Sequence, residues 1–177
     1  MPGPIAIRPA RESDVAAIAR IYGHHCRYGT GTFDTEAPPE THWRERLAEL
    51  NAAGHPFLVS VQGNEVIGFA YAAPFRPRFG WRFSFEDTIY IAPSHDRRGH
   101  GTELLNHLVQ ASRAAGAKNL IAVIGDSHNI PSLRVHERCG FARIGTLRDV
   151  GFKDERWLDV VFMQLRLAAD SLDSTGP

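Results

Sequence analysis

The sequence predicts a single α/β (α+β) domain with a mixed, mostly antiparallel, twisted sheet flanked by helices. The chain has 177 residues, which is long enough for one domain with a buried core. Two strand-like segments, 57–61 and 65–72, flank Gly63 and Asn64, a dipeptide typical of a hairpin turn between antiparallel strands. Helix-like and strand-like segments then alternate without a repeat or linker. We expect six to seven strands and about four helices.

The first half of the chain is expected to hold two helices before the hairpin. A short strand at 5–7 leads to Ser13, a candidate N-cap for a helix that ends near Cys26. The segment 41–53 carries apolar residues on one helical face, and Gly54 follows it as a stop. The hairpin then continues into a β-branched and aromatic strand that ends before Pro93.

The second half is expected to hold two further helices and three strands. A helix with a leucine-rich face ends at Gly116, and a buried strand follows at 120–124. Pro131 and Gly140 are placed as the start and the end of the next helix. The segments 142–148 and 157–167 are predicted to be the closing strands.

Composition limits the classes of partner. Basic and acidic residues number 20 each, so a nucleic-acid-binding or membrane-attracted surface is not indicated. No apolar run has the length of a membrane span, and the segment 1–4 does not begin a signal peptide, so we expect a cytoplasmic protein. Residues 1–167 are expected to form the domain, and the polar segment 168–177 a disordered tail.

Cysteine and histidine spacing gives no metal site. Cys26 and Cys139 are far apart and lack a Cys-x-x-Cys partner, so both are expected to be reduced thiols. Nine histidines are present, but none forms a His-x-x-x-His pair near carboxylates.

The segment 96–101 places glycines where a strand turns into a helix. Gly99 and Gly101 lack Cβ atoms, so the backbone can bring several amide groups against a phosphate at the positive end of the helix dipole. A tight strand-to-helix connection would use the same glycines. Because the segment fits neither a P-loop nor a dinucleotide fingerprint, coenzyme A is the remaining phosphate ligand with this architecture.

This glycine loop, Asp96–Gly101, resembles the Gln/Arg-x-x-Gly-x-Gly/Ala acyl-CoA motif of the GNAT N-acetyltransferases. A second block, 129–141, resembles the later pattern of that family, in which Asn-x-x-Ser/Ala is followed by Gly-Phe. The resemblance extends from Ile5 to Leu167. It is more specific for the phosphinothricin and methionine-sulfoximine acetyltransferases through four strings, namely Phe69–Ala72, Ala122–Gly125, Val135–Glu137 and Arg156–Val160.

The resemblance implies the GNAT fold, and it implies acetyl-CoA as the acyl donor. Asp96 departs from the family's Gln or Arg, so a carboxylate is expected near the pyrophosphate unless it caps the helix or pairs with an arginine. We expect weaker cofactor affinity rather than lost binding. Arg97 and Arg98 either pair with CoA phosphates or are solvated loop arginines. The resemblance implies that Asn129 hydrogen-bonds the pantetheine arm, and the alternative is an ordinary helix cap. The expected cofactor-binding residues are Ile89, Tyr90, Ile91, Arg97, Arg98, Gly99, His100, Gly101, Thr102, Asn129 and Ser132.

Two residues are candidates for proton transfer. Strand alternation puts Glu86, Thr88 and Tyr90 on one face, and Glu86 matches the proposed catalytic glutamate of the phosphinothricin branch. The alternative is a structural carboxylate paired with an arginine. His136 occupies the place of a tyrosine that donates a proton to the departing sulfur in many family members, or it packs against the sheet. The family also implies a backbone N–H, at Ile91, for the carbonyl oxygen.

Substrate choice is expected to depend on the loop 75–83, where arginines alternate with aromatic residues. Guanidinium groups bind carboxylate, phosphinate or sulfone oxygens in pairs, so a small anionic amino acid fits. The alternative is a basic surface loop that touches no substrate. The expected substrate-binding residues are Phe33, Arg76, Arg78, Trp81, Arg82 and Thr88.

The leading interpretation is acetyl-CoA-dependent acetylation of the α-amino group of a phosphinothricin-like amino acid. Methionine sulfoximine or sulfone is the alternative substrate, and a protein N-terminus or a polyamine fits the arginine loop less well. A non-catalytic acyl-CoA sensor would need the glycine loop but neither Glu86 nor the arginine loop. The family resemblance further implies a homodimer.

Overall fold

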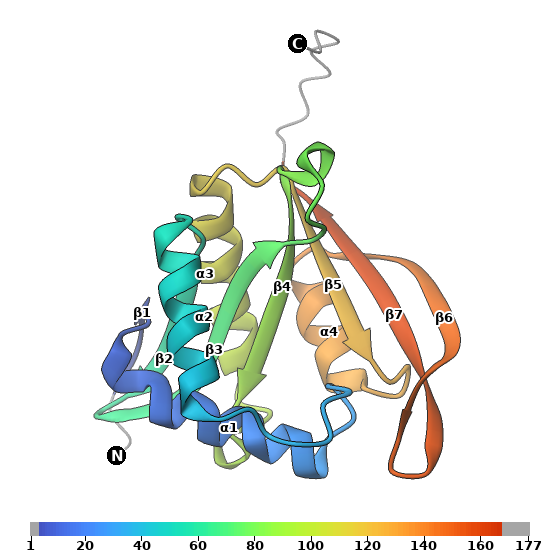
Figure 1. Cartoon of the computed structure of the whole chain (residues 1–177), viewed down its shortest axis with the longest axis horizontal. Coiled ribbons are helices and arrows are strands. Elements are labelled where there is room, and N and C mark those ends of the chain that lie inside the picture. Colours follow the sequence, from blue (N-terminus) through green and yellow to red (C-terminus); the bar gives the residue numbers. More distant parts are fainter. Residues whose placement is uncertain (1–3, 168–177) are drawn as a thin grey trace, which may run out of the picture.

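The computed structural model describes residues 4–167, and the predicted tail lies outside the described residues. One seven-stranded sheet with the order β1-β2-β3-β4-β5-β7-β6 runs through this part of the chain (Figure 1). Its strands are β1 (Ile5–Pro9), β2 (Phe57–Gln62), β3 (Glu65–Pro74), β4 (Ser84–Ile91), β5 (Asn119–Gly125), β6 (Ala142–Lys153) and β7 (Arg156–Arg166). Its helices are α1 (Val15–Tyr28), α2 (Glu40–Ala52), α3 (His100–Ala114) and α4 (Ile130–Arg138). The predicted fold class is confirmed.

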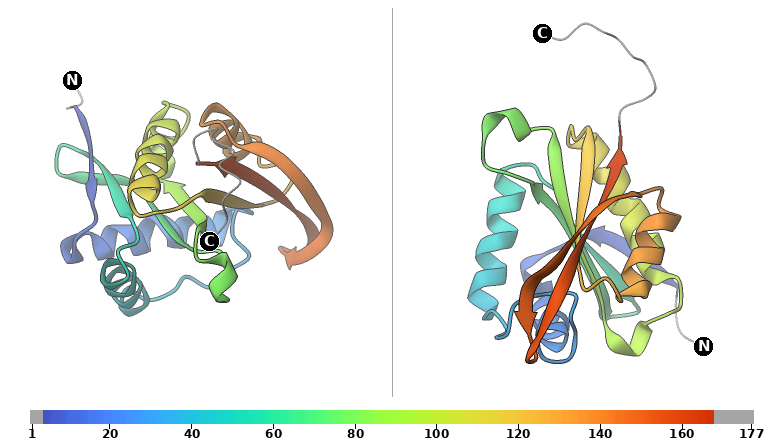
Figure 2. Two further views of the ribbon diagram at one scale, coloured as in Figure 1. Left: turned by 90° about the horizontal axis from the view of Figure 1, so that it is seen from above. Right: turned by 90° about the vertical axis from the view of Figure 1, so that its right-hand side faces the viewer.

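Helices cover both faces of the sheet, as the view from above shows (Figure 2). On one face, α1 and α2 pack Ile18, Trp43 and Leu50 against the sheet. On the other face, α3 and α4 pack Leu104 and Leu133 against it. The sheet therefore separates two apolar cores, and alternate residues of each central strand point into different cores.

The strands β4 and β5 form the one parallel pair within the described sheet, and they separate along their length. Residues 84–87 of β4 pair with 119–122 of β5, and the pairing then stops. Beyond this point, 88–91 of β4 and 123–125 of β5 are not paired with one another. Figure 1 shows the two arrows moving apart toward the end that carries the glycine loop. We call this the β4–β5 divergence. It leaves backbone groups of both strands unused by the ladder.

The predicted start of α1 is wrong. Ser13 does not cap the helix, because Glu12–Asp14 form a 3-10 turn and Asp14 is the N-cap residue of a helix that begins at Val15. The Asp14 carboxylate accepts hydrogen bonds from the backbone N–H of Arg11 and from the guanidinium of Arg8. The ion pair with Arg8, six residues earlier on β1, holds Asp14 in this position, which helix propensity alone does not report.

The strand β6 is longer than predicted, whereas β7 has the predicted length and begins one residue earlier. The strand expected to end at Arg148 continues as β6 to Lys153, with a register shift between Leu147 and Gly151 against β7. Helix α1 also extends two residues past Cys26, to Tyr28.

Among the described helices, none is long and apolar enough to cross a membrane.

Candidate active site

Glu86 lies on β4 just before the β4–β5 divergence. It is half-buried and faces the α1 and α2 side together with Thr88 and Tyr90, as strand alternation predicted. Its cross-strand neighbours are Ala73 on β3 and Ile121 on β5. No hydrogen bond or ion pair of its carboxylate is found among residues 4–167, which argues against a structural carboxylate fixed by an arginine.

The surroundings of Glu86 favour a proton acceptor. Burial raises the pKa of its carboxyl group, the charge of Arg76 lowers that pKa, Asp87 raises it, and Arg46 lowers it, with a net upward direction. A carboxylate with a raised pKa is a stronger base than an ordinary exposed glutamate. Glu86 therefore combines a free carboxylate with increased basicity.

The backbone of β4 turns unused groups toward the divergence. Ala92 donates its N–H to Ile67 of β3. Because the hydrogen-bonding direction alternates along a strand, Ile89 and Ile91 direct their backbone N–H and C=O groups away from β3, into the β4–β5 divergence. His25 of α1 lies there, and its Nε2 is 2.8 Å from the Ile91 carbonyl oxygen. Burial lowers the pKa of His25, and because the carbonyl only accepts, Nε2 carries the proton.

The glycine loop forms the N-terminal end of α3. Gly99 adopts φ of 86°, in the left-handed region, and is the N-cap residue of α3. A Cβ at Gly101 would lie 3.4 Å from the Val135 side chain, an ordinary contact between the start of α3 and α4. The hydroxyl of Thr102 is buried without a hydrogen-bond partner among the described residues. An unpartnered hydroxyl in the first turn fits a site for an anionic group of acetyl-CoA.

The charged residues of the glycine loop are exposed. Arg97 adopts φ of 59°, and both Arg97 and Arg98 have solvent-exposed side chains. The Asp96 carboxylate neither caps α3 nor pairs with an arginine within residues 4–167. The charge of Asp96 raises the pKa of His25, against the larger lowering by burial. The aspartate thus remains an uncompensated negative charge beside the predicted pyrophosphate site.

Asn129, Ser132 and His136 are connected along α4. The Asn129 side chain caps α4 by accepting a hydrogen bond from the Ser132 N–H at 3.3 Å. The Ser132 carbonyl in turn lies 2.8 Å from His136 Nδ1. Asn129 is therefore a helix cap, as the alternative interpretation predicted. The Nδ2 atom of Asn129 lies close to Gly31.

His136 is a buried member of an ion pair. Its Nε2 lies 3.0 Å from Asp87 Oδ2, and both side chains are 2% exposed. Burial would lower the pKa of His136, but the charge and hydrogen bond of Asp87 and the hydrogen bond to Ser132 outweigh it and raise that pKa. Since the Ser132 carbonyl and an ionised carboxylate only accept, both ring nitrogens donate. Neither N–H is left for a departing sulfur, so this geometry favours the packing role over the proton donor.

The arginine loop stands beside Glu86 at the start of β4. Arg76 is the member whose charge lowers the pKa of Glu86. Its guanidinium also lies over the Phe75 ring at 4.0 Å. Arg82 lies over the rings of Phe79 and Phe83 at 4.2 and 4.3 Å. Two of the three arginines are thus stacked on aromatic rings of their own loop.

The structure does not bring all predicted substrate-binding residues together. Phe33 lies in the connection from α1 to α2, at the divergent end of β4, whereas Arg78, Trp81 and Arg82 lie at the opposite end of that strand (Figure 1). Thr88 lies two residues from Glu86 on β4, and the charge of Arg76 acts on Glu86 from the loop before β4. The predicted set therefore divides into two groups separated by roughly the length of an eight-residue strand, on the order of 25 Å.

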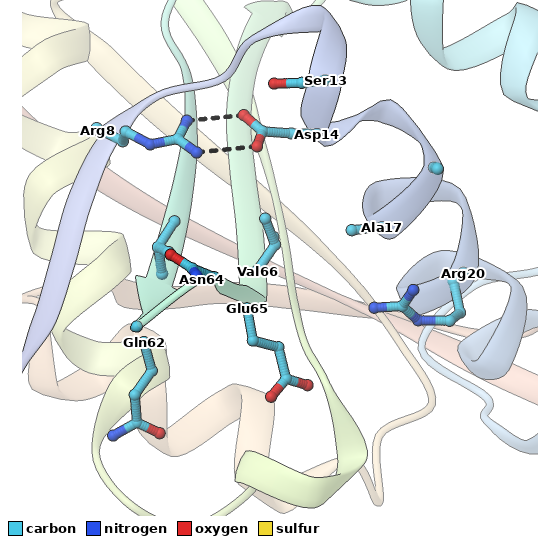
Figure 3. A pocket seen from close by; sticks show the side chains of 12 residues that line it. Arg8, Ser13, Asp14, Ala17, Arg20, Gln62, Asn64, Glu65 and Val66 are labelled. Atoms are coloured by element: carbon cyan, nitrogen blue, oxygen red, sulfur yellow. Dashed lines mark hydrogen bonds and ion pairs between the residues drawn. The ribbon is translucent and has the colours of Figure 1, made fainter. Parts of the chain in front are cut away.

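Two pockets in the described part of the chain lie away from the glycine loop. One of about 990 Å³ lies between β1, the start of α1 and the β2–β3 hairpin, with the Arg8–Asp14 ion pair on its wall (Figure 3). It contains no predicted site residue. A smaller pocket of about 390 Å³ is closer to the chemistry, since Arg46 and Tyr71 line it and Tyr71 pairs with Thr88 across β3 and β4.

Comparison with known proteins identifies the family. The sequence profile of the Acetyltransferase (GNAT) family matches residues 18–141. The chain belongs to the GNAT acetyltransferase family. This acetyltransferase is 43% identical over 171 residues to the phosphinothricin N-acetyltransferase of Alcaligenes faecalis, with 97% of this chain and 86% of the relative covered.

Two further relatives of this GNAT acetyltransferase connect it to both predicted branches. It is 35% identical to the L-methionine sulfoximine/L-methionine sulfone acetyltransferase of Salmonella typhimurium, covering 92% of this chain and 95% of that one. The phosphinothricin acetyltransferase of Sinorhizobium meliloti, solved in complex with acetyl-CoA, superposes with a TM-score of 0.91 at 36% identity, covering 98% of this chain and 92% of that one. The sequence prediction of the family and enzyme class is confirmed.

Three residues around this site were not singled out from the sequence, namely Asp87, His25 and Lys153. Asp87 alternates with Phe85 and Ile89 on an apolar strand face, and a carboxylate in that pattern could have been recognised as a buried partner. His25 and Lys153 gave no comparable signal, because their partners lie 66 and more than 120 residues away.

Proposed function

We propose that this protein transfers the acetyl group of acetyl-CoA to the α-amino group of a phosphinothricin-like amino acid. The observation that carries the proposal is Glu86, a carboxylate without a partner in residues 4–167 and with a raised pKa, at the β4–β5 divergence. Sequence similarity to phosphinothricin acetyltransferases supports the substrate class. The positive charges of Arg76 and Arg46 near Glu86 suit an anionic amino acid.

Acetyl-CoA supplies the acetyl group as a thioester. The glycine loop and Thr102 would bind its phosphates, and the backbone of Ile89–Ile91, with Asn129 and Ser132 across the divergence, would bind its arm. Glu86 accepts the proton of the ammonium group, directly or through a water, so that the neutral amine can form the new C–N bond as the C–S bond breaks. A backbone N–H of β4, that of Ile91, stabilises the developing negative charge on oxygen.

His136 is assigned to holding α4 on β4 rather than to protonating the departing sulfur. A thiol has a pKa of about 8.5, so its thiolate is a fair leaving group near neutral pH. The thiolate takes, through water, the second proton that the nitrogen loses as the amide forms. We also propose a homodimer, which light scattering on the purified protein would test.

Methionine sulfoximine or methionine sulfone is the second candidate substrate, favoured by the similarity to enzymes of that name. Release of free CoA should be measured with phosphinothricin, methionine sulfoximine, methionine sulfone, ordinary amino acids, polyamines and N-terminal peptides. Turnover restricted to the first three supports the proposal, and their order of kcat/KM ranks the two branches. Binding of acetyl-CoA without turnover of any amine would instead support a sensor.

Replacing Glu86 tests the mechanism. Glu86→Gln keeps the shape of the side chain but removes the base, so kcat/KM should fall by about 10²–10⁴-fold. Affinity for acetyl-CoA, measured by calorimetry, should stay within a small factor of the original. A variant with normal binding and normal turnover would remove Glu86 from the mechanism.

A further inference from the structure

The residues 29–33 that follow α1 lie across the β4–β5 divergence, and we call them the exit loop. The Gly31 carbonyl accepts a hydrogen bond from the Tyr90 hydroxyl of β4 at 3.4 Å. On the β5 side, a Cβ at Gly125 would lie 2.7 Å from the Thr30 carbonyl oxygen. A Cβ at Gly31 would lie 3.2 Å from Asn129 Nδ2. The exit loop therefore touches both separating strands and the start of α4.

Lys153 is a buried cation beneath this loop. It is 3% exposed, and its Nζ donates hydrogen bonds to the carbonyl oxygens of Gly29 and Thr32, each at 2.9 Å. The chain has only two lysines among its 20 basic residues, and the other, Lys118, is exposed. Burying a charged ammonium costs free energy unless polar partners compensate. The hydrogen-bond partners of Nζ are neutral carbonyls of the exit loop, so Lys153 connects β6 to both ends of that loop.

Other contacts fix the exit loop from the remaining sides. Thr30 donates its hydroxyl to the buried Asp126 carboxylate at 2.7 Å. The Thr32 hydroxyl lies 2.7 Å from that of Tyr22. A Cβ at Gly151 of β6 would lie 2.5 Å from the Phe33 ring, so only glycine lets β6 pack so closely on that ring. Strand β6 and the exit loop thus form one wall, and the exit loop contacts Tyr90, which lies on the same face of β4 as Glu86.

We propose that Lys153 is a positioning residue that fastens the exit loop to β6 and so shapes the wall against which the acceptor amine binds. The inference rests on the proposed function for the identity of the site, but its structural part does not. Two charge-assisted hydrogen bonds to carbonyls three residues apart fix both ends of the exit loop. Without these two hydrogen bonds the exit loop can move away from the β4–β5 divergence, and the Phe33 ring no longer packs on Gly151.

The test replaces Lys153 by methionine, which keeps the length of the stem and removes the ammonium group. Hydrogen–deuterium exchange should become faster by about tenfold or more in peptides that cover residues 29–33. The KM for the amine should rise by about tenfold, and the Kd for acetyl-CoA should change by a smaller factor, because the glycine loop that would bind its phosphates is untouched. Lys118→Met, which removes the exposed lysine, should change none of these quantities.

A purely structural role predicts a different result. Lys153→Met would then have a lower Tm but an unchanged KM for the amine and unchanged exchange in residues 29–33, and the proposal would be overturned. Lys153→Gln retains N–H donors without the charge, so its amine KM should lie between those of the wild type and Lys153→Met.

A milder variant covers the case in which Lys153→Met does not fold. Thr30→Val removes the hydrogen bond to Asp126 on the other side of the exit loop with little change in volume. It should raise the amine KM and the exchange of residues 29–33 in the same direction, and no change in either would refute the proposed wall. If the wild type acetylates no amine, the proposed function fails, while the exchange data still decide whether Lys153 fastens the loop.

Discussion

Removing the His136 side chain should destabilise the protein far more than removing that of His128. Both histidines are paired with an aspartate, His136 with Asp87 at 3.0 Å and His128 with Asp126 at 3.3 Å. The first pair is 2% exposed on both sides, whereas the His128 side chain is 91% exposed. His136→Ala should therefore lower the free energy of unfolding by about 3–5 kcal/mol, because it leaves a buried carboxylate unpaired. His128→Ala should cost less than about 1 kcal/mol.

The pH dependence of this difference has a definite sign. The pKa of His136 is raised in the folded state above its unfolded value of about 6.5. Such a group contributes stability that is fully present below the unfolded pKa and is lost as the pH rises through the folded pKa. The gap in unfolding free energy between wild type and His136→Ala should therefore be larger at about pH 6 than at about pH 9.

Urea denaturation of the wild type, His136→Ala and His128→Ala at both pH values measures these free energies. A loss below about 1 kcal/mol for His136→Ala, or a gap that widens with rising pH, would refute the buried ion pair. His136→Gln decides the catalytic question, since its amide can still donate to Asp87. If it remains stable but loses kcat by about 10²-fold, His136 is the proton donor after all.

Two further predictions concern charges at the site. Arg76→Gln removes a charge that lowers the pKa of Glu86, so the acid limb of the pH profile of kcat/KM should move to higher pH, with Arg78→Gln as the control. No movement would show that the charge of Arg76 does not reach the base. Asp96→Gln removes the uncompensated carboxylate of the glycine loop, so calorimetry should show acetyl-CoA bound about fivefold more tightly, equivalent to about 1 kcal/mol at a partly screened site. Unchanged or weaker binding would mean that Asp96 does not oppose the pyrophosphate.

Much of the fold was readable from the sequence because its signals are local. The hairpin at Gly63 and Asn64, the ends of α3 and α4 and the position of the glycine loop all follow from residues within a few positions of one another. The face on which Glu86 lies followed from strand alternation alone. Two boundaries failed. The start of α1 involves an ion pair of Asp14 with Arg8 on β1, and the end of β6 depends on pairing with β7.

The sequence by itself determined the family, the enzyme class, the strand-to-helix glycine loop and the candidate base, because each depends on residue types at fixed short spacing. Only the tertiary structure decided what His136 touches, which substrate-loop residues lie near Glu86, and that Lys153 is buried under the exit loop. The partners of His136 and Lys153 lie 49 and more than 120 residues away. Such contacts are set by the order of strands in the sheet, β5-β7-β6 beside the divergence from β4, which no local pattern encodes.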